Sequence, residues 1–158
     1  MRKGAGQVIR TLRDTDRDAA STVCLRSFLL AVAPSLGDEG VATFRTIAAP
    51  DGFASRSAQD NLQWVYDDAG VIKGVAELKQ GRHVAMLFVD PAWQRQGVGD
   101  ALLAALIAQV RTELLTVSAS VPSVPFYARH GFHCSGEVAA VAGLVYQPME
   151  RRVVLPAG

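Results

Sequence analysis

The sequence predicts an α/β fold with a central sheet that is mixed but mostly antiparallel and has helices on both faces. The first observation is a run of three strand-like segments, residues 62–66, 71–79 and 83–89, which are joined by short turns. Short turns between successive strands favour antiparallel pairing. The second observation is a long helical pattern after Gly97, which returns the chain to a strand at residues 114–118. Such a crossover favours a parallel neighbour, so the sheet is expected to be mixed.

The segment before these strands predicts one short strand and two helices. Residues 7–12 are a strand candidate, and residues 15–18 have the form of a capping arrangement that opens a helix running to about residue 33. A second helix is expected at residues 38–48. Residues 51–60 are polar and are predicted to be a loop.

The helix after Gly97 is strongly amphipathic. Its apolar residues recur at intervals of three and four, which places them along one face: Val98, Leu102, Leu103, Leu106, Ile107 and Val110. After the following strand, the pattern predicts a short helix at about residues 123–130. Two further strands, one near Phe132 and one at residues 144–155, are expected to complete the sheet.

Composition is that of one globular domain. The chain has 158 residues, of which 49% are hydrophobic, so we expect a single domain over residues 1–158 with loose ends at 1–6 and 156–158. The net charge of +1 gives no case for a nucleic-acid partner. No apolar run reaches the length of a membrane span, and the start leads into no secretory signal core. A soluble, cytoplasmic protein is therefore expected, and a homodimer remains open.

The cysteines and histidines predict neither a disulfide framework nor a metal site. Cys24 and Cys134 are the two cysteines of the chain, and both are expected to be small buried hydrophobic residues. The three histidines have no carboxylate or cysteine partners at ligand spacing, so no metal is expected. They also have no serine or cysteine partner at a recognisable spacing for a nucleophilic triad.

The turn Gly97-Val-Gly99 is a candidate anion site. The first amides of a helix have no carbonyl partner within the helix, and glycines let a ligand approach them, so the turn could hold a pyrophosphate. The dinucleotide fingerprint is excluded because Leu102 stands where a third glycine or alanine is needed, and a P-loop is excluded because no Gly-Lys-Ser/Thr follows. A tight strand-to-helix connection without a ligand remains the alternative.

Two motifs carry a resemblance to a known family. Gln94-Arg-Gln-Gly97-Val-Gly99 resembles the Gln/Arg-x-x-Gly-x-Gly/Ala acetyl-CoA motif of the GCN5-related N-acetyltransferase (GNAT) superfamily. Phe126-Tyr127-Ala-Arg-His-Gly131-Phe132 resembles the Phe-Tyr-x-x-x-Gly-Phe signature in the second half of that fold. The two motifs occur in the expected order and separation. The resemblance covers about residues 7–154 and is firmest from Gly74 to Phe132.

The resemblance implies a fold with a splayed strand pair and acetyl-CoA as co-substrate. The backbone of the strand ending at Val89 would pair with pantetheine, and the glycine turn would hold the pyrophosphate. The implied cofactor-binding residues are Leu87, Phe88, Val89, Gln94, Arg95, Gln96, Gly97, Val98, Gly99, Asp100, Ala101, Ser118 and Ser120. Ser118 departs from the family, which commonly has asparagine there, and a hydroxyl makes fewer hydrogen bonds than an amide. Strand packing for Leu87 to Val89 and a capping role for the serines stay open.

Transfer of an acetyl group from a thioester to an amine requires a base, a stabilised oxyanion and a proton for the thiolate. Glu77 lies in an apolar strand and could face the cleft as the base, although a strand can also turn it to solvent. A main-chain amide near Phe88 could polarise the thioester carbonyl, and Tyr127 could donate the proton, unless its ring only packs in the core.

We therefore expect an enzyme that acetylates a primary amine by direct attack in a ternary complex. The acceptor, a small molecule or a peptide, is not indicated by the sequence, and no nucleic acid or membrane partner is expected. The alternative is a non-catalytic acyl-CoA-binding or interaction module on the same fold, for which Ser118 is the one indication.

Overall fold

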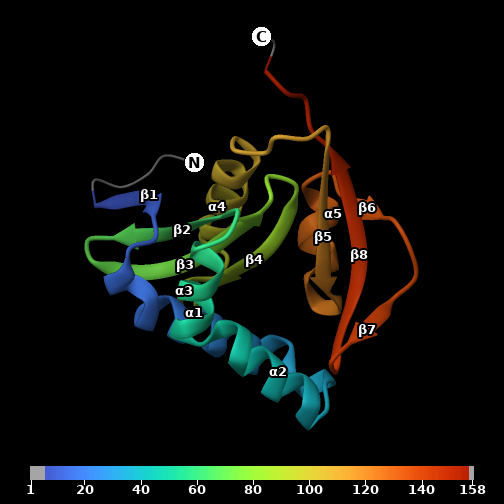
Figure 1. Cartoon of the computed structure of the whole chain (residues 1–158), viewed down its shortest axis with the longest axis horizontal. Coiled ribbons are helices and arrows are strands. Elements are labelled where there is room, and N and C mark those ends of the chain that lie inside the picture. The colour runs from blue at the N-terminus through green and yellow to red at the C-terminus, as the bar shows by residue number, and fades with distance from the viewer. Residues whose placement is uncertain (1–5, 157–158) are drawn as a thin grey trace.

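The computed structural model describes residues 6–156, which contain one eight-stranded sheet with helices against both of its faces (Figure 1). The strands are β1 (Gln7–Thr11), β2 (Asn61–Asp68), β3 (Val71–Lys79), β4 (His83–Val89), β5 (Leu114–Ser120), β6 (His133–Cys134), β7 (Ala139–Val141) and β8 (Leu144–Arg152). The α-helices are α1 (Arg17–Ala31), α2 (Asp38–Ala48), α3 (Pro50–Ser57), α4 (Val98–Ile107) and α5 (Val124–Arg129). Short 3-10 helices are η1 (Asp14–Asp16), η2 (Ala33–Ser35), η3 (Pro91–Trp93) and η4 (Val121–Ser123).

The sheet confirms the predicted mixed topology. Its strand order is β1-β2-β3-β4-β5-β8-β6, and β7 pairs with β8. The meander β2-β3-β4 is antiparallel, while β4 and β5, which α4 connects, are parallel. The parallel pairing is very short and consists of two residue pairs, His83 with Thr116 and Val84 with Val117. Beyond these two pairs β4 and β5 separate, which gives the sheet an opening.

Helix α4 packs closely on one face of the sheet. Its apolar face joins Leu102, Leu103 and Leu106 to a core cluster with residues of β3, β4 and β5. Gly74 of β3 lets the helix approach, because a Cβ atom there would lie only 2.6 Å from Leu102 Cδ1. Helix α5 contributes Tyr127 to the same cluster, so α4 and α5 cover the same face.

Helices α1, α2 and α3 cover the other face over β2, β3 and β4. Phe28 of α1 and Phe44 of α2 stack with their ring centroids 4.0 Å apart, and Phe44 meets Phe88 of β4 edge to face at 5.2 Å. Helix α2 also reaches the β7–β8 turn, where Thr43 Oγ1 donates to the Ala142 carbonyl at 2.7 Å. This contact joins two parts of the chain that lie on either side of the opening.

The predicted loop at residues 51–60 is wrong, because most of it forms helix α3. Ala49 is extended and Pro50 takes the first helical position, where its missing N–H costs no hydrogen bond. Phe53 is fully buried, and Arg56 Nη1 donates back to the Ile47 carbonyl at 2.8 Å. One buried aromatic residue in a polar segment gave too weak a periodicity for the sequence to predict this helix.

The start of α1 and the fate of one cysteine also differ from expectation. Helix α1 begins at Arg17, directly after η1. The Asp16 side chain caps η1 and not α1, because its Oδ2 accepts from the Arg13 amide at 2.7 Å. Cys24 is buried as predicted, and burial raises the pKa of its thiol, but Cys134 on β6 is exposed. A two-residue strand at the end of the sheet path has no layer to cover that thiol.

The bounds of several strands also differ by a few residues from those predicted. β2 extends to Asp68, β5 to Ser120, and β8 ends at Arg152, while β7 was not predicted. The loose ends expected at the termini fall largely on residues 1–5 and 157–158, which lie outside the described range. Within residues 6–156, no helix combines the length and the apolar character that crossing a bilayer requires.

Candidate active site

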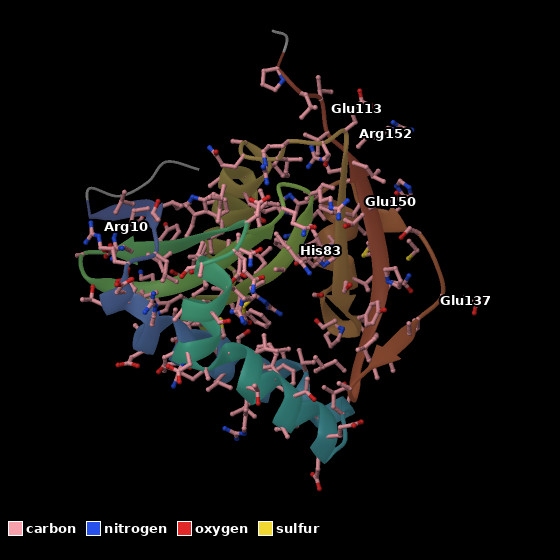
Figure 2. All side chains as sticks on the ribbon, viewed as in Figure 1. Arg10, His83, Glu113, Glu137, Glu150 and Arg152 are labelled. Atoms are coloured by element: carbon pink, nitrogen blue, oxygen red, sulfur yellow. The ribbon has the colours of Figure 1, made fainter. Side chains whose placement is uncertain are left out.

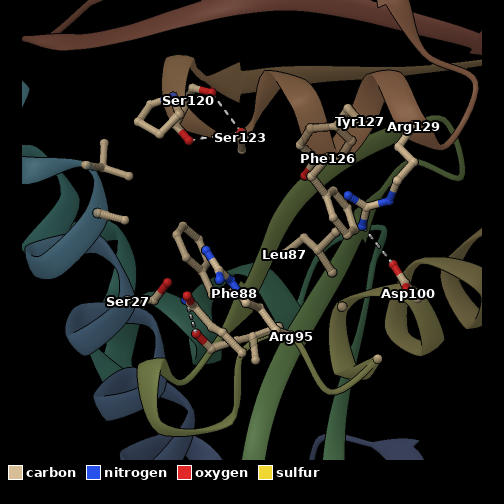
Figure 3. Close-up of a pocket in the computed structure, with 17 residues that line it drawn as sticks. Ser27, Leu87, Phe88, Arg95, Asp100, Ser120, Ser123, Phe126, Tyr127 and Arg129 are labelled. Atoms are coloured by element: carbon tan, nitrogen blue, oxygen red, sulfur yellow. Dashed lines mark hydrogen bonds and ion pairs between the residues drawn. The ribbon is translucent and has the colours of Figure 1, made fainter.

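A cavity of about 630 Å³ lies where β4 and β5 separate (Figure 3). Its walls come from both faces of the sheet. Ser27, Ala31 and Val32 line it from α1 and its end, while Phe126 and Tyr127 line it from α5. Because α1 and α5 lie on opposite faces, the cavity passes through the sheet by way of the opening. Two molecules that enter from opposite faces can therefore meet inside it.

The backbone at the end of β4 borders this cavity. Leu87, Phe88 and Val89 all line it, as the resemblance implied. On their other side they pair with β3 through Ala76, Val75 and Gly74. Because the pairing with β5 stops at Val84, the β4 backbone groups that point toward β5 have no strand partner beyond that residue. An extended amide-containing ligand could take up these groups in the way that a strand does.

The turn between β4 and α4 is held in place by Asp90, a residue that the sequence analysis missed. Asp90 Oδ1 accepts from the Ala92 amide at 2.9 Å, and Arg26 Nε of α1 donates to Asp90 Oδ2 at 3.0 Å. Gln94 Nε2 donates to the Val89 carbonyl at 3.2 Å. Asp90 could have been recognised as an aspartate directly before Pro91, a common start of a turn.

The glycine turn has the backbone geometry that only glycine adopts easily. Gly97 has φ of +82° and is the N-cap of α4, and Arg95 has φ of +63°. A side chain at Gly97 would therefore strain the backbone as well as obstruct a ligand. Gly99 has ordinary helical geometry, but a Cβ atom there would lie 3.3 Å from Phe126 Cε1 and 3.5 Å from Val89 Cγ2. Both glycines line the cavity.

Other residues of the motif do not line the cavity with their side chains. Val98 is buried and packs in the core with α4, and Gln96 and Ala101 are not part of the lining. Gln94, Arg95 and Asp100 do line it. For Gln96, Val98 and Ala101, only the backbone is available for the implied role.

Charged side chains of α4 and α5 meet at one end of the cavity. Asp100 Oδ1 is 3.4 Å from Arg129 Nη2 (Figure 3). It is also 2.8 Å from Nε2 of His130, the residue after α5. Arg129 also lies over the Phe126 ring, 5.5 Å from its centroid. Two guanidinium groups, those of Arg95 and Arg129, therefore border the cavity, and its one lining carboxylate already has basic neighbours. This charge distribution suits a phosphate-bearing ligand.

Tyr127 lines the cavity from α5 with its ring held by Phe126 and Phe132, at 5.3 Å from each. The residue is 5% exposed, and burial raises the pKa of its hydroxyl above the ordinary value. Among the described residues, no hydrogen-bond partner is found for this hydroxyl. A phenol in this state stays protonated at neutral pH and is available as a donor.

The two serines of β5 have different surroundings. Ser120 lines the cavity, and its Oγ donates to Ser123 Oγ at 2.9 Å while Ser123 Oγ donates to the Ser120 carbonyl at 2.7 Å. Ser118 does not line the cavity. It is exposed in the middle of β5, in register with Pro148 of β8. The implied cofactor contact of the Ser118 side chain is therefore not supported. Ser118 shares a face of β5 with Ser120, but the cavity reaches only the end of that strand.

Glu77 does not face the cavity, contrary to expectation. Its side chain is completely buried on β3. Arg56 Nε donates to Glu77 Oε2 at 2.8 Å, and Gln63 Nε2 donates to Oε1 at 3.0 Å, so both carboxylate oxygens are engaged. Helix α3, which the sequence analysis took for a loop, brings Arg56 over this acid. The role of Glu77 as a base stays a prediction.

The sequence did not single out the residues of α1 and its end that line the cavity. Ser27, Ala31 and Val32 were not named as site residues, yet all three line it. Figure 3 shows Ser27 on the opposite wall from the α5 residues. No local signal marks them, because the packing of α1 against the sheet decides which end of the helix meets the opening.

Comparisons with known proteins agree with this geometry. Residues 32–153 match the family described as an acetyltransferase (GNAT) domain. The chain is 48% identical over 50 residues to the uncharacterized N-acetyltransferase YafP of Escherichia coli K12, which covers 32% of each chain. It is 32% identical over 71 residues to the peptidyl-lysine N-acetyltransferase YiaC of the same organism, which covers 44% of this chain and 49% of YiaC. These matches span about a third and about half of the two relatives' lengths.

Solved structures share the whole fold. A GCN5-related N-acetyltransferase from Rhodopseudomonas palustris superposes with a TM-score of 0.83 at 22% identity, covering 97% of this chain and 99% of that one. YncA, a putative acetyltransferase from Salmonella typhimurium in a structure with acetyl-CoA, superposes with a TM-score of 0.72 at 20% identity, covering 98% of both chains. With the family match over most of its length, the chain belongs to the GCN5-related N-acetyltransferase family.

Proposed function

We propose that this enzyme transfers an acetyl group from acetyl-CoA to a primary amine by direct attack in a ternary complex. The observation that carries the proposal is the cavity that passes through the sheet between β4 and β5. It gives the acyl donor and the amine separate entrances on opposite faces. Direct transfer needs such an arrangement, because both reactants must be bound at once in close approach.

The acyl donor would occupy the side of the cavity formed by α4 and α5. The β4 backbone beyond Val84 would pair with the amides of pantetheine, and the amides at the start of α4 would hold the pyrophosphate. Arg95 and Arg129 supply positive charge for the phosphates. The residues present therefore fit coenzyme A in both shape and charge, and YncA supports this placement because its structure holds acetyl-CoA on the same fold.

The amine would enter from the side of α1. The lining there is small or apolar, with Ala31, Val32 and Phe88 beside Ser27. Such a wall suits the methylene stem of an alkyl amine better than a second charged group. We therefore propose an amine of the lysine type. The similarity to YiaC, which is named for peptidyl-lysine, supports the same substrate class.

The chemical step would place the nitrogen against the thioester carbonyl at the end of β4. A main-chain amide near Phe88 would stabilise the developing oxyanion, as pre-oriented donors do in other acyl transfers. As the carbon–sulfur bond breaks, the Tyr127 hydroxyl would give its proton to the departing thiolate, and the proton lost by the attacking nitrogen would restore the hydroxyl. Burial raises the pKa of this hydroxyl, so it is protonated before the reaction begins. The proton of the ammonium group leaves before attack, and Glu77 as the acceptor of that proton stays a prediction.

A product assay tests this proposal directly. The protein is incubated with acetyl-CoA and a panel of alkyl amines, polyamines and lysine peptides, and acetylated products are identified by mass spectrometry. We expect acetylation of lysine-type amines, with turnover reduced in Tyr127→Phe. If coenzyme A binds tightly and no amine in the panel is acetylated, the chain is an acyl-CoA-binding module and the proposal is wrong.

A further inference from the structure

A second cavity of about 540 Å³ lies at the closed end of the opening between β4 and β5. It is formed by the end of β3, the start of β4 and the start of β5. Lys79, Arg82, His83 and Thr116 are among the residues that line it. The β3–β4 turn is fastened to β5 here, because the Thr116 amide donates to the Arg82 carbonyl at 3.0 Å. The cavity therefore has a fixed wall.

This basic cavity opens on the same face of the sheet as the proposed amine entrance. On β5, Leu115 and Val117 point into the core that α4 covers, so Thr116 between them points to the opposite face. His83 lies on that face too, since its Nδ1 is 2.8 Å from Thr116 Oγ1. Figure 2 shows His83 between β4 and β5, in the part of the sheet that α1, α2 and α3 leave uncovered.

The lining is positively charged. Lys79 and Arg82 are exposed, and neither has an ion-pair partner among the described residues. Among those residues, no carboxylate belongs to the lining. The neighbouring Arg111 is already paired with Asp60 at 2.8 Å. Arg82 Nη2 donates to Gln80 Oε1 at 2.9 Å, which leaves its charge without a counter-ion. A ligand with negative charge would therefore meet two cations that lack an ion-pair partner among the described residues.

Two further titratable residues, His83 and Glu150, lie in or near this basic cavity. Burial holds the pKa of His83 below its ordinary value, and the charges of Lys79 and Arg82 lower it further, so the imidazole is neutral at pH 7. Glu150 of the neighbouring strand β8 is in register with Thr116 and shares its face of the sheet, but it is not part of the lining. The hydroxyls of Thr112 and Thr116 already donate to the carbonyls of Leu114 and Arg82. The uncharged donors of the lining that can reach a bound anion are the Gln80 amide and the His83 ring.

The distance to the reaction centre fits one extended acceptor. Leu87, which lines the larger cavity, is four positions after His83 on β4, and at about 3.3 Å per residue this is roughly 13 Å. A lysine side chain with an acidic group about three residues away along an extended peptide spans such a distance. Both cavities could therefore be occupied by a single molecule.

We propose that the basic cavity is the subsite for an anionic group of the acceptor, so that the preferred acceptor is a lysine-type amine in an acidic peptide. The subsite rests on the proposed function for the identity of the amine. The carboxylate would lie against Lys79 and Arg82 while the amine reaches the opening in the sheet. It selects among acceptors by charge and takes no part in the chemical step.

The imidazole signal of His83 provides a test that needs no turnover. NMR titration of the wild-type protein in sodium sulfate and in sodium chloride of equal ionic strength reports anion binding beside His83. We expect sulfate to raise the pKa of His83 by stabilising its charged form, and to leave that of His133 on β6 unchanged. In the double variant Lys79→Gln, Arg82→Gln, sulfate should not change the pKa of His83. The control variant is Arg13→Gln, which lies beyond the β1 edge of the sheet and should respond to sulfate as the wild type does.

A peptide pair then tests whether this anion belongs to the acceptor. Two capped peptides, each with lysine and, three residues later, glutamate or glutamine, are titrated into protein saturated with coenzyme A. We expect about fivefold tighter binding of the glutamate peptide, the scale of an exposed ion pair, and loss of that preference in the double substitution. No response of His83 to sulfate would overturn the subsite. A response to sulfate with equal binding of both peptides would overturn its assignment to the acceptor, and neither result bears on acetyl transfer, which the product assay measures separately.

Discussion

Replacing Glu77 by glutamine distinguishes a structural acid from a catalytic base. The wild-type carboxylate is fully buried and accepts from Arg56 at 2.8 Å and from Gln63 at 3.0 Å. In Glu77→Gln, the guanidinium loses its counter-ion while remaining mostly buried. Removing one partner of a buried pair costs about 3–5 kcal/mol. The Arg56 side chain is 21% exposed, so water compensates part of this loss and we expect about 3 kcal/mol, the lower end of that range.

This loss is large enough to measure by thermal and urea unfolding. For a chain of this length, about 3 kcal/mol lowers Tm by roughly 6–12 °C. Glu137→Gln is the matched control, since Glu137 is exposed and should change stability by less than about 0.5 kcal/mol. In the double variant Glu77→Gln, Arg56→Met the two losses should be less than additive, because removing the second partner also removes the unpaired charge.

The kinetic readout decides between the two roles. If Glu77 is structural, turnover per folded molecule at low temperature should change little, and equally at every pH. Unchanged stability together with a defect that is large at neutral pH and shrinks toward the pKa of the amine, about 10, would refute this reasoning and assign Glu77 as the base.

Three further substitutions test other parts of the structure. Tyr127→Phe should preserve stability and coenzyme A affinity but lower turnover by roughly 10²-fold, and equal turnover where chemistry is rate-limiting would exclude it as the acid. Gly99→Ala should weaken coenzyme A binding roughly tenfold in calorimetry, because the added Cβ would lie 3.3 Å from Phe126. Alanine has the higher helix propensity, so Tm should be unchanged or higher. Unchanged coenzyme A affinity would contradict the assignment of the turn. Hydrogen bonds from Arg10 lower the pKa of Asp16, so its stabilisation is complete above about pH 4 and is lost as pH falls through the lowered pKa. Asp16→Asn should therefore cost about 2 kcal/mol at pH 7, and this difference should vanish in strong acid if urea unfolding is compared across pH.

The sequence by itself determined the elements whose signals are local. The apolar runs predicted β3 and β4 with their observed bounds, and the helix expected at residues 38–48 is α2. The apolar stripe after Gly97 predicted the helix α4 that covers one face. The two motifs around Gly97 and Tyr127 identified the family, because both depend on residues close together in the chain.

The tertiary structure alone decided which side chains meet. Strands β4 and β5 separate after two residue pairs because each is also paired with its other neighbour, β3 or β8. No local sequence pattern predicts this separation. Likewise, Glu77 pairs with Arg56 because α3 folds over β3. Ser118 and Ser120 share one face of β5, but only Ser120 lines the cavity, because the cavity lies at the end of that strand. Burial and contact between distant segments are properties of the packed chain, so the cavity through the sheet could be located only once its walls from α1 and α5 were in place.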